Sequence, residues 1–351
     1  MNTVKEGFVN VLNHYEIWKT SQAFYHNRTS SVDLDYFLHL PCYHYTDVES
    51  INSCNSNVIV IDDVTESVHS KNYFCLYDKT KYYIIISGGS WDKDKHDIGI
   101  KNYDLISYPF FLFELVDTYM SPHRFCFYLD KTYDFQYPKD HVFCSTIGNV
   151  KDERDKLVDS IIKNIEYKNY ILRYSGEDFG APSNHLDVMN FVKGEFDPYT
   201  PVLPEYHHDV ASTLPIQIYN SGYAYLVVES DIDYNDCFFM TEKTLKALIT
   251  GIPFVVVATP FFLSTLKNAG FKTYDELWDE SYDSEKNLEK RILKIIKLLQ
   301  DLQFFDWQKH KSKLQSIADH NLRNFLTCNK IADDFFTSFE HTVENLNDSR
   351  R

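Results

Sequence analysis

The chain has 351 residues, of which 44% are hydrophobic and 25% charged, an ordinary balance for a soluble globular protein. This length exceeds what a single hydrophobic core usually supports, so two domains are expected. The formal net charge of −16 disfavours non-specific attraction to nucleic acid or to an anionic membrane surface, although it is compatible with a local basic groove.

Neither a membrane span nor a secretory signal is predicted. No run of 18 or more apolar residues occurs, and the N-terminal sequence MNTVKEGFVNVLNHYEIWK has no apolar signal-peptide core. The seven cysteines include no C-x-x-C pair, so they support neither a zinc site nor a redox motif. Cys75, Cys126 and Cys144 lie in apolar runs typical of a core. A cytoplasmic location is expected from these features.

Several predicted strands with little helix between some of them indicate an irregular α/β domain at residues 1–136. Apolar residues at helical spacing favour a helix within residues 1–28. Short apolar runs predict strands at Asn57–Ile61, Tyr73–Tyr77, Tyr82–Ile86, Asp104–Ser107 and Arg124–Tyr128. The polar, proline-containing stretch DKTYDFQYPKDH is the expected boundary with the next domain.

Three titratable residues of this first domain are candidate functional groups. Asp92 and His96 lie in the loop SGGSWDKDKHD, which follows the predicted strand Tyr82–Ile86, and Glu114 comes later in the chain. Sheets of α/β proteins bind ligands at the carboxyl ends of their strands. A solvated loop or a structural polar role is the alternative for each residue.

Residues 137–300 predict a second α/β domain. A strand at His141–Ser145 leads into a helix from Asp152 to Ile165, and a strand at Tyr170–Tyr174 leads into the loop SGEDFG. Arg154 lies in the first turn of the helix, where the helix dipole disfavours a cation. An anionic ligand at that helix end would explain its position, and pairing with neighbouring carboxylates is the alternative.

The stretch from Ala224 to Tyr282 alternates strand and helix signals. These elements are a strand at Tyr225–Val228, a helix from Thr241 to Gly251, a strand at Pro253–Val257 and a helix at Phe261–Ala269. Thr241 suits a helix N-cap and Gly251 a helix end. Such β–α units build a parallel sheet with ligands at the carboxyl ends of its strands.

Polar residues lie where these elements end or begin. Glu229 and Ser230 follow the first strand, and Thr241, Glu242 and Lys243 open the helix. Carboxylates accept hydrogen bonds from sugar hydroxyls, and a lysine beside free helix N–H groups suits phosphate.

Lys243 resembles Arg154 in being a cation at a helix N-terminus. Glu242 taken alone is explained by the helix dipole and by pairing with Lys246. Two misplaced cations in neighbouring β–α units favour a shared anionic ligand instead.

Beyond residue 282 the sequence is helical. An amphipathic helix is predicted around residues 288–299, with its lysines and Arg291 on a solvated face. A phosphate-binding patch is the alternative for these basic residues. Residues 301–351 are expected to form helices that pack back on the two domains.

These motifs resemble the GT-B glycosyltransferases of the α-1,3-fucosyltransferase type and their viral and bacterial relatives. The family signature F-E-N-S…Y-I-T-E-K…A-L-x-x-G-x-x-P is similar to VVESDIDYNDCFFMTEKTLKALITGIP, where Thr241–Lys243 match T-E-K and Val228–Ser230 stand at F-E-N. STIGNVKDERDKLV is similar to the family's S-N…R element, with Arg154 at the arginine. GFKTYDELWDESYD is similar to a segment of virus-borne relatives, so the resemblance covers about residues 140–290.

The resemblance implies two Rossmann-like domains in the GT-B arrangement, with a helical C-terminal segment. It implies transfer of a sugar from a nucleotide-diphosphate sugar to a hydroxyl acceptor, normally a glycan, with inversion of configuration. Arg154 and Lys243 would bind the diphosphate, while Glu229 and Glu242 would bind the ribose or the sugar. Val228 and Ser230 depart from the family's Phe and Asn, so the nucleotide and the sugar stay open.

No metal or other cofactor is expected from the resemblance, because positive side chains and helix ends stabilise the leaving diphosphate in enzymes of this fold. The catalytic base would be a carboxylate of the first domain, for which Asp92 and Glu114 are candidates.

Two other functions stay open. One is a phage-type DNA glycosyltransferase that acts on a flipped hydroxymethylated base, which the acidic net charge disfavours. The other is a non-catalytic protein that binds a nucleotide sugar without turning it over.

Overall fold

The computed structural model describes residues 15, 34, 38–63, 71–91, 97–109, 132–174, 177–180, 216–233, 237–327 and 329–348, with only the backbone at 71–72, 91, 177–178, 217, 326–327 and 329–333. The chain divides into two compact units, each of which contains helices and a wholly or mainly parallel sheet. Unit 1 comprises Met1–Phe113, Asp236–Phe239 and Cys328–Arg351, and unit 2 comprises Glu114–Asn235 and Met240–Thr327. None of the helices in these described ranges has the length and hydropathy that a bilayer crossing requires.

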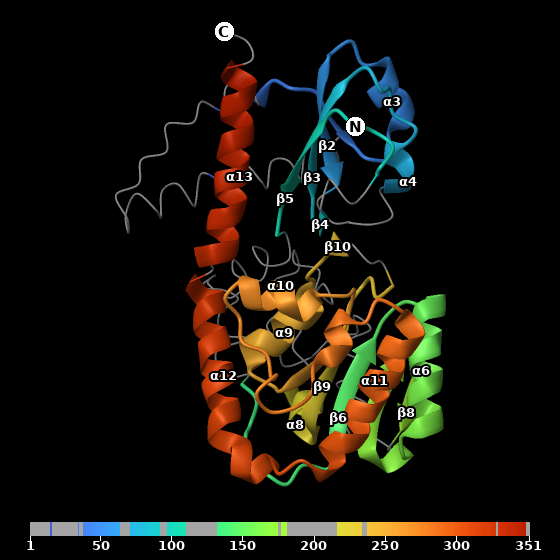
Figure 1. The fold of residues 1–351 in the computed structure, drawn as a ribbon, viewed down its shortest axis with the longest axis vertical. Helices are drawn as coiled ribbons and strands as arrows, with labels where there is room; N and C mark the ends of the chain where they lie inside the picture. The colour runs from blue at the N-terminus through green and yellow to red at the C-terminus, as the bar shows by residue number, and fades with distance from the viewer. Residues whose placement is uncertain are drawn as a thin grey trace, which may run out of the picture. The chain divides into compact units, whose positions relative to one another are not determined.

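Unit 1 is built on a four-stranded parallel sheet with the strand order β1-β2-β3-β5 (Figure 1). Its elements in chain order are β1 (Cys42–His44), α3 (Val48–Ser53), β2 (Val58–Asp63), α4 (Lys71–Phe74), β3 (Tyr82–Ser87), β4 (Ser90–Trp91), β5 (Tyr103–Ser107), β10 (Cys237–Phe238) and α13 (Asn329–Asp348). Strands β4 and β10 form a separate antiparallel pair. The strands expected from the apolar runs at residues 57–61, 82–86 and 104–107 are therefore confirmed.

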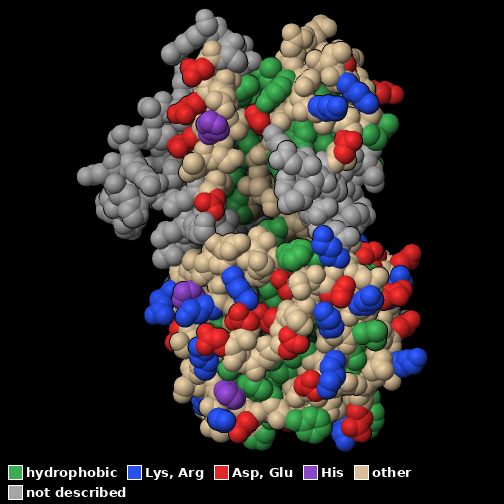
Figure 2. All heavy atoms as spheres, in the orientation of Figure 1, with side chains coloured by type: hydrophobic (Ala, Val, Ile, Leu, Met, Phe, Trp, Pro, Cys, Tyr) green, Lys and Arg blue, Asp and Glu red, His purple; other side chains and the backbone are tan. Residues whose placement is uncertain are grey.

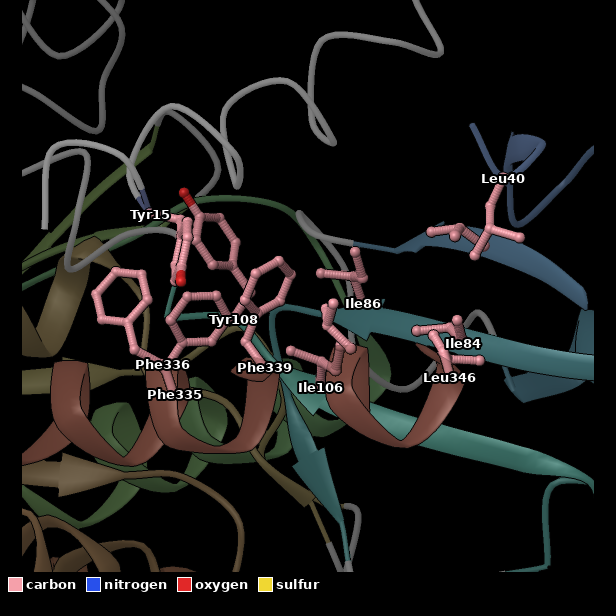
Figure 3. Packing of buried hydrophobic residues seen from close by; sticks show 12 residues of the cluster. Tyr15, Leu40, Ile84, Ile86, Ile106, Tyr108, Phe335, Phe336, Phe339 and Leu346 are labelled. Carbon is pink, nitrogen blue, oxygen red and sulfur yellow. The ribbon is translucent and has the colours of Figure 1, made fainter. Parts of the chain in front are cut away.

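Alternate residues of the unit 1 strands face two different cores. On one face, Val60 and Ile84 belong to a core cluster that also contains Tyr15 and the α13 residues Phe336 and Leu346. In Figure 3, Ile84 lies beside Leu346, and Tyr15 lies by Phe336. On the other face, Ile59 packs with residues such as Phe74. Burying one large apolar side chain contributes about 1.5–3 kcal/mol, so α13 is an integral part of the core of this unit.

The predicted strand at Tyr73–Tyr77 is wrong. Tyr73 and Phe74 are the last two residues of helix α4, and residues 75–77 form the turn that follows it. Phe74 and Tyr77 are both buried, and their rings lie 5.5 Å apart. This spacing of three residues is helical, so both rings enter the core from one side.

Unit 2 contains a five-stranded sheet with the order β11-β9-β6-β7-β8, in which only β8 is antiparallel to its neighbour (Figure 1). Its elements are β6 (His141–Ile147), α6 (Asp152–Asn164), η2 (Tyr167–Asn169), β7 (Tyr170–Tyr174), β8 (Glu177–Gly180), α8 (Ile216–Ser221), β9 (Gly222–Val228), α9 (Glu242–Thr250), β11 (Phe254–Val257), α10 (Phe262–Asn268), η4 (Ser281–Ser284), α11 (Leu288–Asp301), η5 (Leu302–Phe304) and α12 (Trp307–Thr327).

Helices cover both faces of the unit 2 sheet. Helix α6 connects β6 to β7, and α9 connects β9 to β11 in the opposite direction along the sheet. Because such crossovers are right-handed, the two helices lie on opposite faces. Helix α11 packs beside α6, and α12 packs on α9, which is why almost every residue of α9 is buried.

Three further expectations for unit 2 can be compared with the structure. The N-cap at Thr241 and the helix end at Gly251 are confirmed, and Gly251 has a φ of 78°. The expected loop SGEDFG is wrong at residues 177–180, which pair with β7 as strand β8.

The solvated position expected for Arg291 is also wrong. Arg291 is 1% exposed, and its guanidinium donates to the carbonyls of Glu285 and Ile232. Because both acceptors lie in loops, the side chain turns inward at the start of α11 instead of lying on its outer face. Among the cysteines, Cys144 is buried as expected, whereas Cys75 is exposed.

Some expectations lie outside the described residues, namely Cys126, the strand at 124–128 and all of the helix within 1–28 except residue 15.

A boundary near residue 136 was expected, whereas residues 114–136 group with unit 2. The Tyr133 backbone N–H donates to the Thr250 carbonyl at 2.7 Å. The terminal helices divide, with α12 in unit 2 and α13 in unit 1.

Candidate functional site

The strand order of unit 2 reverses between β6 and β9. The chain passes from β6 to β7 on one side and later returns to place β9 on the other side of β6. The loops after β6 and β9 therefore diverge, and open α/β sheets bind ligands at such a reversal, beyond the carboxyl ends of the strands. Every sequence-predicted donor residue lies on these two loops or in the first turns of α6 and α9.

Glu229 follows β9 directly and is 1% exposed. Its carboxylate accepts hydrogen bonds from the hydroxyls of Thr241 and Thr244, both at 2.6 Å, and from the Thr241 backbone N–H at 3.2 Å. Burial raises the pKa of this carboxyl, while Lys243 and the two hydroxyls act in the opposite direction. Glu229 therefore fastens the loop after β9 to the start of α9, and its carboxylate has little surface left for a ligand.

Lys243 lies in the first turn of α9 with its side chain 22% exposed. Its Nζ is 2.8 Å from Glu242 Oε1, 3.2 Å from Thr241 Oγ1 and 3.3 Å from Ser230 Oγ. Burial would raise the pKa of the Glu242 carboxyl, but the charges of Lys243 and Lys246 hold that pKa below its usual range. The Glu242 carboxyl is therefore ionised at neutral pH, and the side chains of Glu242 and Lys243 both retain some exposure.

Arg154 is only 3% exposed, although it lies in the first turn of α6. One Nη donates to the Asn149 carbonyl at 2.9 Å, and the other donates to the carbonyls of Glu229 at 2.9 Å and Ser230 at 3.3 Å. Burial lowers the pKa of this guanidinium, which nearby carboxylates oppose. Arg154 thus joins the loops after β6 and β9, and its Nη groups are directed at backbone rather than at solvent.

Lys151 was not among the sequence-predicted residues. It is the N-cap residue of α6, and its Nζ donates to the Ser230 carbonyl at 2.7 Å and lies 3.4 Å from Asp231 Oδ1. Its side chain is 26% exposed. A lysine just outside a helix looks like an ordinary solvated residue, and only its position on the loop after β6 could have indicated a role.

Lys151, Arg154 and Lys243 form what we call the Ser230 cation cluster, because each donates a hydrogen bond to the backbone or side chain of Ser230. The carboxylates of Glu229, Asp231 and Glu242 lie among these cations and offset their mutual repulsion. The cluster therefore offers two partly exposed ammonium groups beside an ionised carboxylate. Ammonium groups bind phosphate, and a carboxylate accepts hydrogen bonds from hydroxyls.

The two candidate bases, Asp92 and Glu114, lie outside the described residues, as does His96. At the carboxyl end of β2 in unit 1, Asp63 is 1% exposed and accepts a hydrogen bond from Ser87 Oγ at 3.0 Å. In the part of the chain that the structure describes, no group of three or more His, Cys, Asp or Glu side chains is arranged to bind a metal ion.

The sequence was also compared with known proteins. No protein-family model matches the chain, and no curated protein matches it significantly. The geometry around Ser230 and the motifs of the sequence itself are therefore the features that indicate a function.

Proposed function

We propose that this protein is a glycosyltransferase that moves a sugar from a nucleoside-diphosphate sugar to a hydroxyl acceptor. The Ser230 cation cluster, located where the strand order of unit 2 reverses, is the observation that carries the proposal. A ligand with phosphates and hydroxyls suits this mixture of ammonium groups and carboxylates better than a simple anion does. The T-E-K sequence at Thr241–Lys243 supports the same assignment.

Lys243 and Lys151 are the proposed ligands of the diphosphate, because their side chains are partly exposed. Arg154 acts indirectly by holding the two loops together. Glu242 retains an ionised carboxylate for a hydroxyl of the ribose or the sugar, whereas the carboxylate of Glu229 is used within the fold.

The reaction forms a bond between the acceptor oxygen and the anomeric carbon of the sugar. The bond from that carbon to the diphosphate breaks, and its electron pair leaves with the diphosphate. Fixed ammonium groups stabilise this developing negative charge, which is the larger share of catalysis in such transfers. The acceptor proton passes to a general base, for which Asp92 and Glu114 of the first part of the chain stay candidates.

The proposal extends to the GT-B arrangement, in which unit 2 binds the donor and unit 1 serves the acceptor. A glycan acceptor is favoured over DNA by the net charge of −16. On the face drawn in Figure 2, acidic and basic side chains of unit 2 are intermingled and form no extended basic field.

A thermal-shift panel of nucleoside diphosphates and nucleotide sugars tests the proposal. A ligand at 100 times its dissociation constant stabilises the folded state by about 2.7 kcal/mol. Lys243→Ala should remove most of that shift, whereas Lys290→Ala, an exposed lysine of α11, should leave it unchanged. Failure of every nucleotide to stabilise the protein would reject the proposal. Binding with neither hydrolysis nor transfer of a labelled sugar would instead identify a non-catalytic binding protein.

A further inference from the structure

The loop after β11 holds an aromatic residue in an unfavourable backbone conformation. Phe261 has a φ of 65°, and no other non-glycine residue in the described ranges has a positive φ. A bulky residue in the left-handed region is an outlier, and such outliers gather at functional sites. Glycine or asparagine would adopt this conformation at a much lower cost.

Asp283 of η4 fixes this loop with three hydrogen bonds. Its carbonyl accepts from the Phe261 backbone N–H at 2.7 Å. Its carboxylate accepts from the backbone N–H groups of Leu263 at 2.8 Å and Ser264 at 3.1 Å. The surrounding structure therefore imposes the conformation of Phe261, and the ring projects from a rigid support.

The Phe261 ring is directed outward. Phe261 is 44% exposed, whereas the next residue, Phe262, is 2% exposed and anchors α10. The Nζ of Lys286 lies 5.9 Å from the centroid of the Phe261 ring. Folding alone gives no reason for an exposed phenylalanine here, because its ring adds little to the core and its backbone conformation is costly.

The loop that holds Phe261 follows the strand next to β9, and the loop after β9 carries Ser230. Strand β11 lies next to β9, and the Glu229 N–H donates to the Val257 carbonyl at 2.9 Å. Neighbouring strands are about 4.8 Å apart, so the loops after β11 and β6 are separated by roughly 10 Å along the edge of the sheet. That span is on the scale of a nucleoside between its base and its phosphates.

We propose that the Phe261 ring is the platform on which the base of the nucleotide stacks. This inference rests on the proposed function, and it specifies that the base, and not only the diphosphate, contributes to donor affinity. Stacking on an aromatic ring tolerates different bases because each base presents a π-face. The loop after β11 then binds one end of the donor and the Ser230 cation cluster binds the other.

Titration calorimetry on the full chain tests this platform with Phe261→Asn and Phe261→Tyr, using UDP, GDP and ADP as probes. Asparagine tolerates the left-handed conformation and removes the ring, whereas tyrosine retains the ring. We expect Phe261→Asn to weaken the tightest-binding nucleotide about tenfold. Phe261→Tyr should retain the affinity of the natural protein within about twofold. Thermal unfolding should show Phe261→Asn to be at least as stable as the natural protein, because the backbone strain is relieved.

Two results would overturn the platform. Unchanged affinity in Phe261→Asn would show that the ring does not contact the base. An equal loss in Phe261→Tyr would show that the loop, rather than an aromatic ring, matters. In both cases the natural protein binds nucleotide, so the proposed function stands. If the natural protein binds none of the three, the proposed function itself fails.

Discussion

The carboxyl edges of the two parallel sheets differ in how their loops are arranged. In unit 1 the described strands β1, β2, β3 and β5 follow one another across the sheet in chain order. In unit 2 the order reverses at β6 and β9, and cations from both diverging loops meet at Ser230. The order in which the strands are connected thus determines which loops lie next to each other at the carboxyl edge of a sheet. In the described part of the chain, only unit 2 has such a reversal, which brings cations from two of these loops together at Ser230.

The buried cations of the two units show the same contrast. Lys81 of unit 1 is 8% exposed and donates to the carbonyls of Ile51, Asn52 and Cys54 at the end of α3. Arg154 of unit 2 also donates only to carbonyls, but these belong to two loops at the edge where the strand order reverses. Lys81 therefore caps the C-terminal end of α3, whereas Arg154 holds together two loops of the candidate site.

The largest effect is expected from Glu229→Ala. This change leaves two hydroxyls and one backbone N–H buried without their acceptor, at about 1–3 kcal/mol for each group. We expect the free energy of unfolding to fall by roughly 3–5 kcal/mol in urea denaturation. Glu229→Gln, which retains one carbonyl acceptor, should lose clearly less. A loss below about 1 kcal/mol in the alanine variant would contradict the anchoring role of Glu229.

A paired experiment on Lys81 and Arg154 separates stability from binding. Lys81→Met and Arg154→Met should each cost roughly 2–3 kcal/mol, because each leaves buried carbonyls without a charged donor. Only Arg154→Met should also weaken nucleotide binding, since only Arg154 holds the loops around Ser230. Titration calorimetry at a temperature where both variants are folded measures their affinities for the nucleotide. Equal affinities would contradict a role for Arg154, but not Lys81, in nucleotide binding.

A smaller effect is expected from Lys151→Ala. Loss of one phosphate contact to a charged donor should weaken nucleoside-diphosphate binding about tenfold, with little change in stability. Lys156, an exposed lysine in the same helix, supplies the matched control. Should Lys156→Ala weaken binding as much as Lys151→Ala, the effect would come from the general charge of α6 and not from the Ser230 cation cluster.

The smallest effect concerns Glu242 and pH. The pKa of its carboxyl is lowered from the ordinary value of 4.5. The ionised form therefore contributes stability that is fully present above pH 4.5 and is lost as pH falls through the lower folded-state pKa. The stability advantage over Glu242→Gln, about 0.5–1 kcal/mol at pH 7, should shrink as pH falls below 4.5. Denaturant titrations at several pH values measure it, and an advantage that grew on acidification would contradict this sign.

Much of the fold could be predicted from local sequence. The apolar runs that became β2, β3, β6 and β7 are buried on both faces, so each reads as a continuous strand signal. Helix α4 was missed because it is short, and its aromatic residues were equally compatible with a strand. Strand β8 was missed because its pairing with β7 is a tertiary contact.

The candidate site could be predicted only in outline. Thr241 could be predicted because it suits a helix N-cap. Lys243 and Arg154 could be predicted because a cation is unfavourable at a helix N-terminus. The burial of Arg154 and Arg291 could not be predicted, since each donates to a carbonyl of a loop distant in the chain, that of Glu229 for Arg154 and that of Ile232 for Arg291. Lys151 was missed for the same reason, because its partners are Ser230 and Asp231.

Helix α13 has a consequence for how the protein is made. The core of unit 1 joins strands from the first third of the chain to Phe335 and Phe336 near its end. A ribosome adds about 5–20 residues per second, so β5 is synthesised on the order of tens of seconds before α13. During that interval one face of the unit 1 sheet has no helix α13 to cover it. Nascent chains should therefore depend on a chaperone until the last helix emerges.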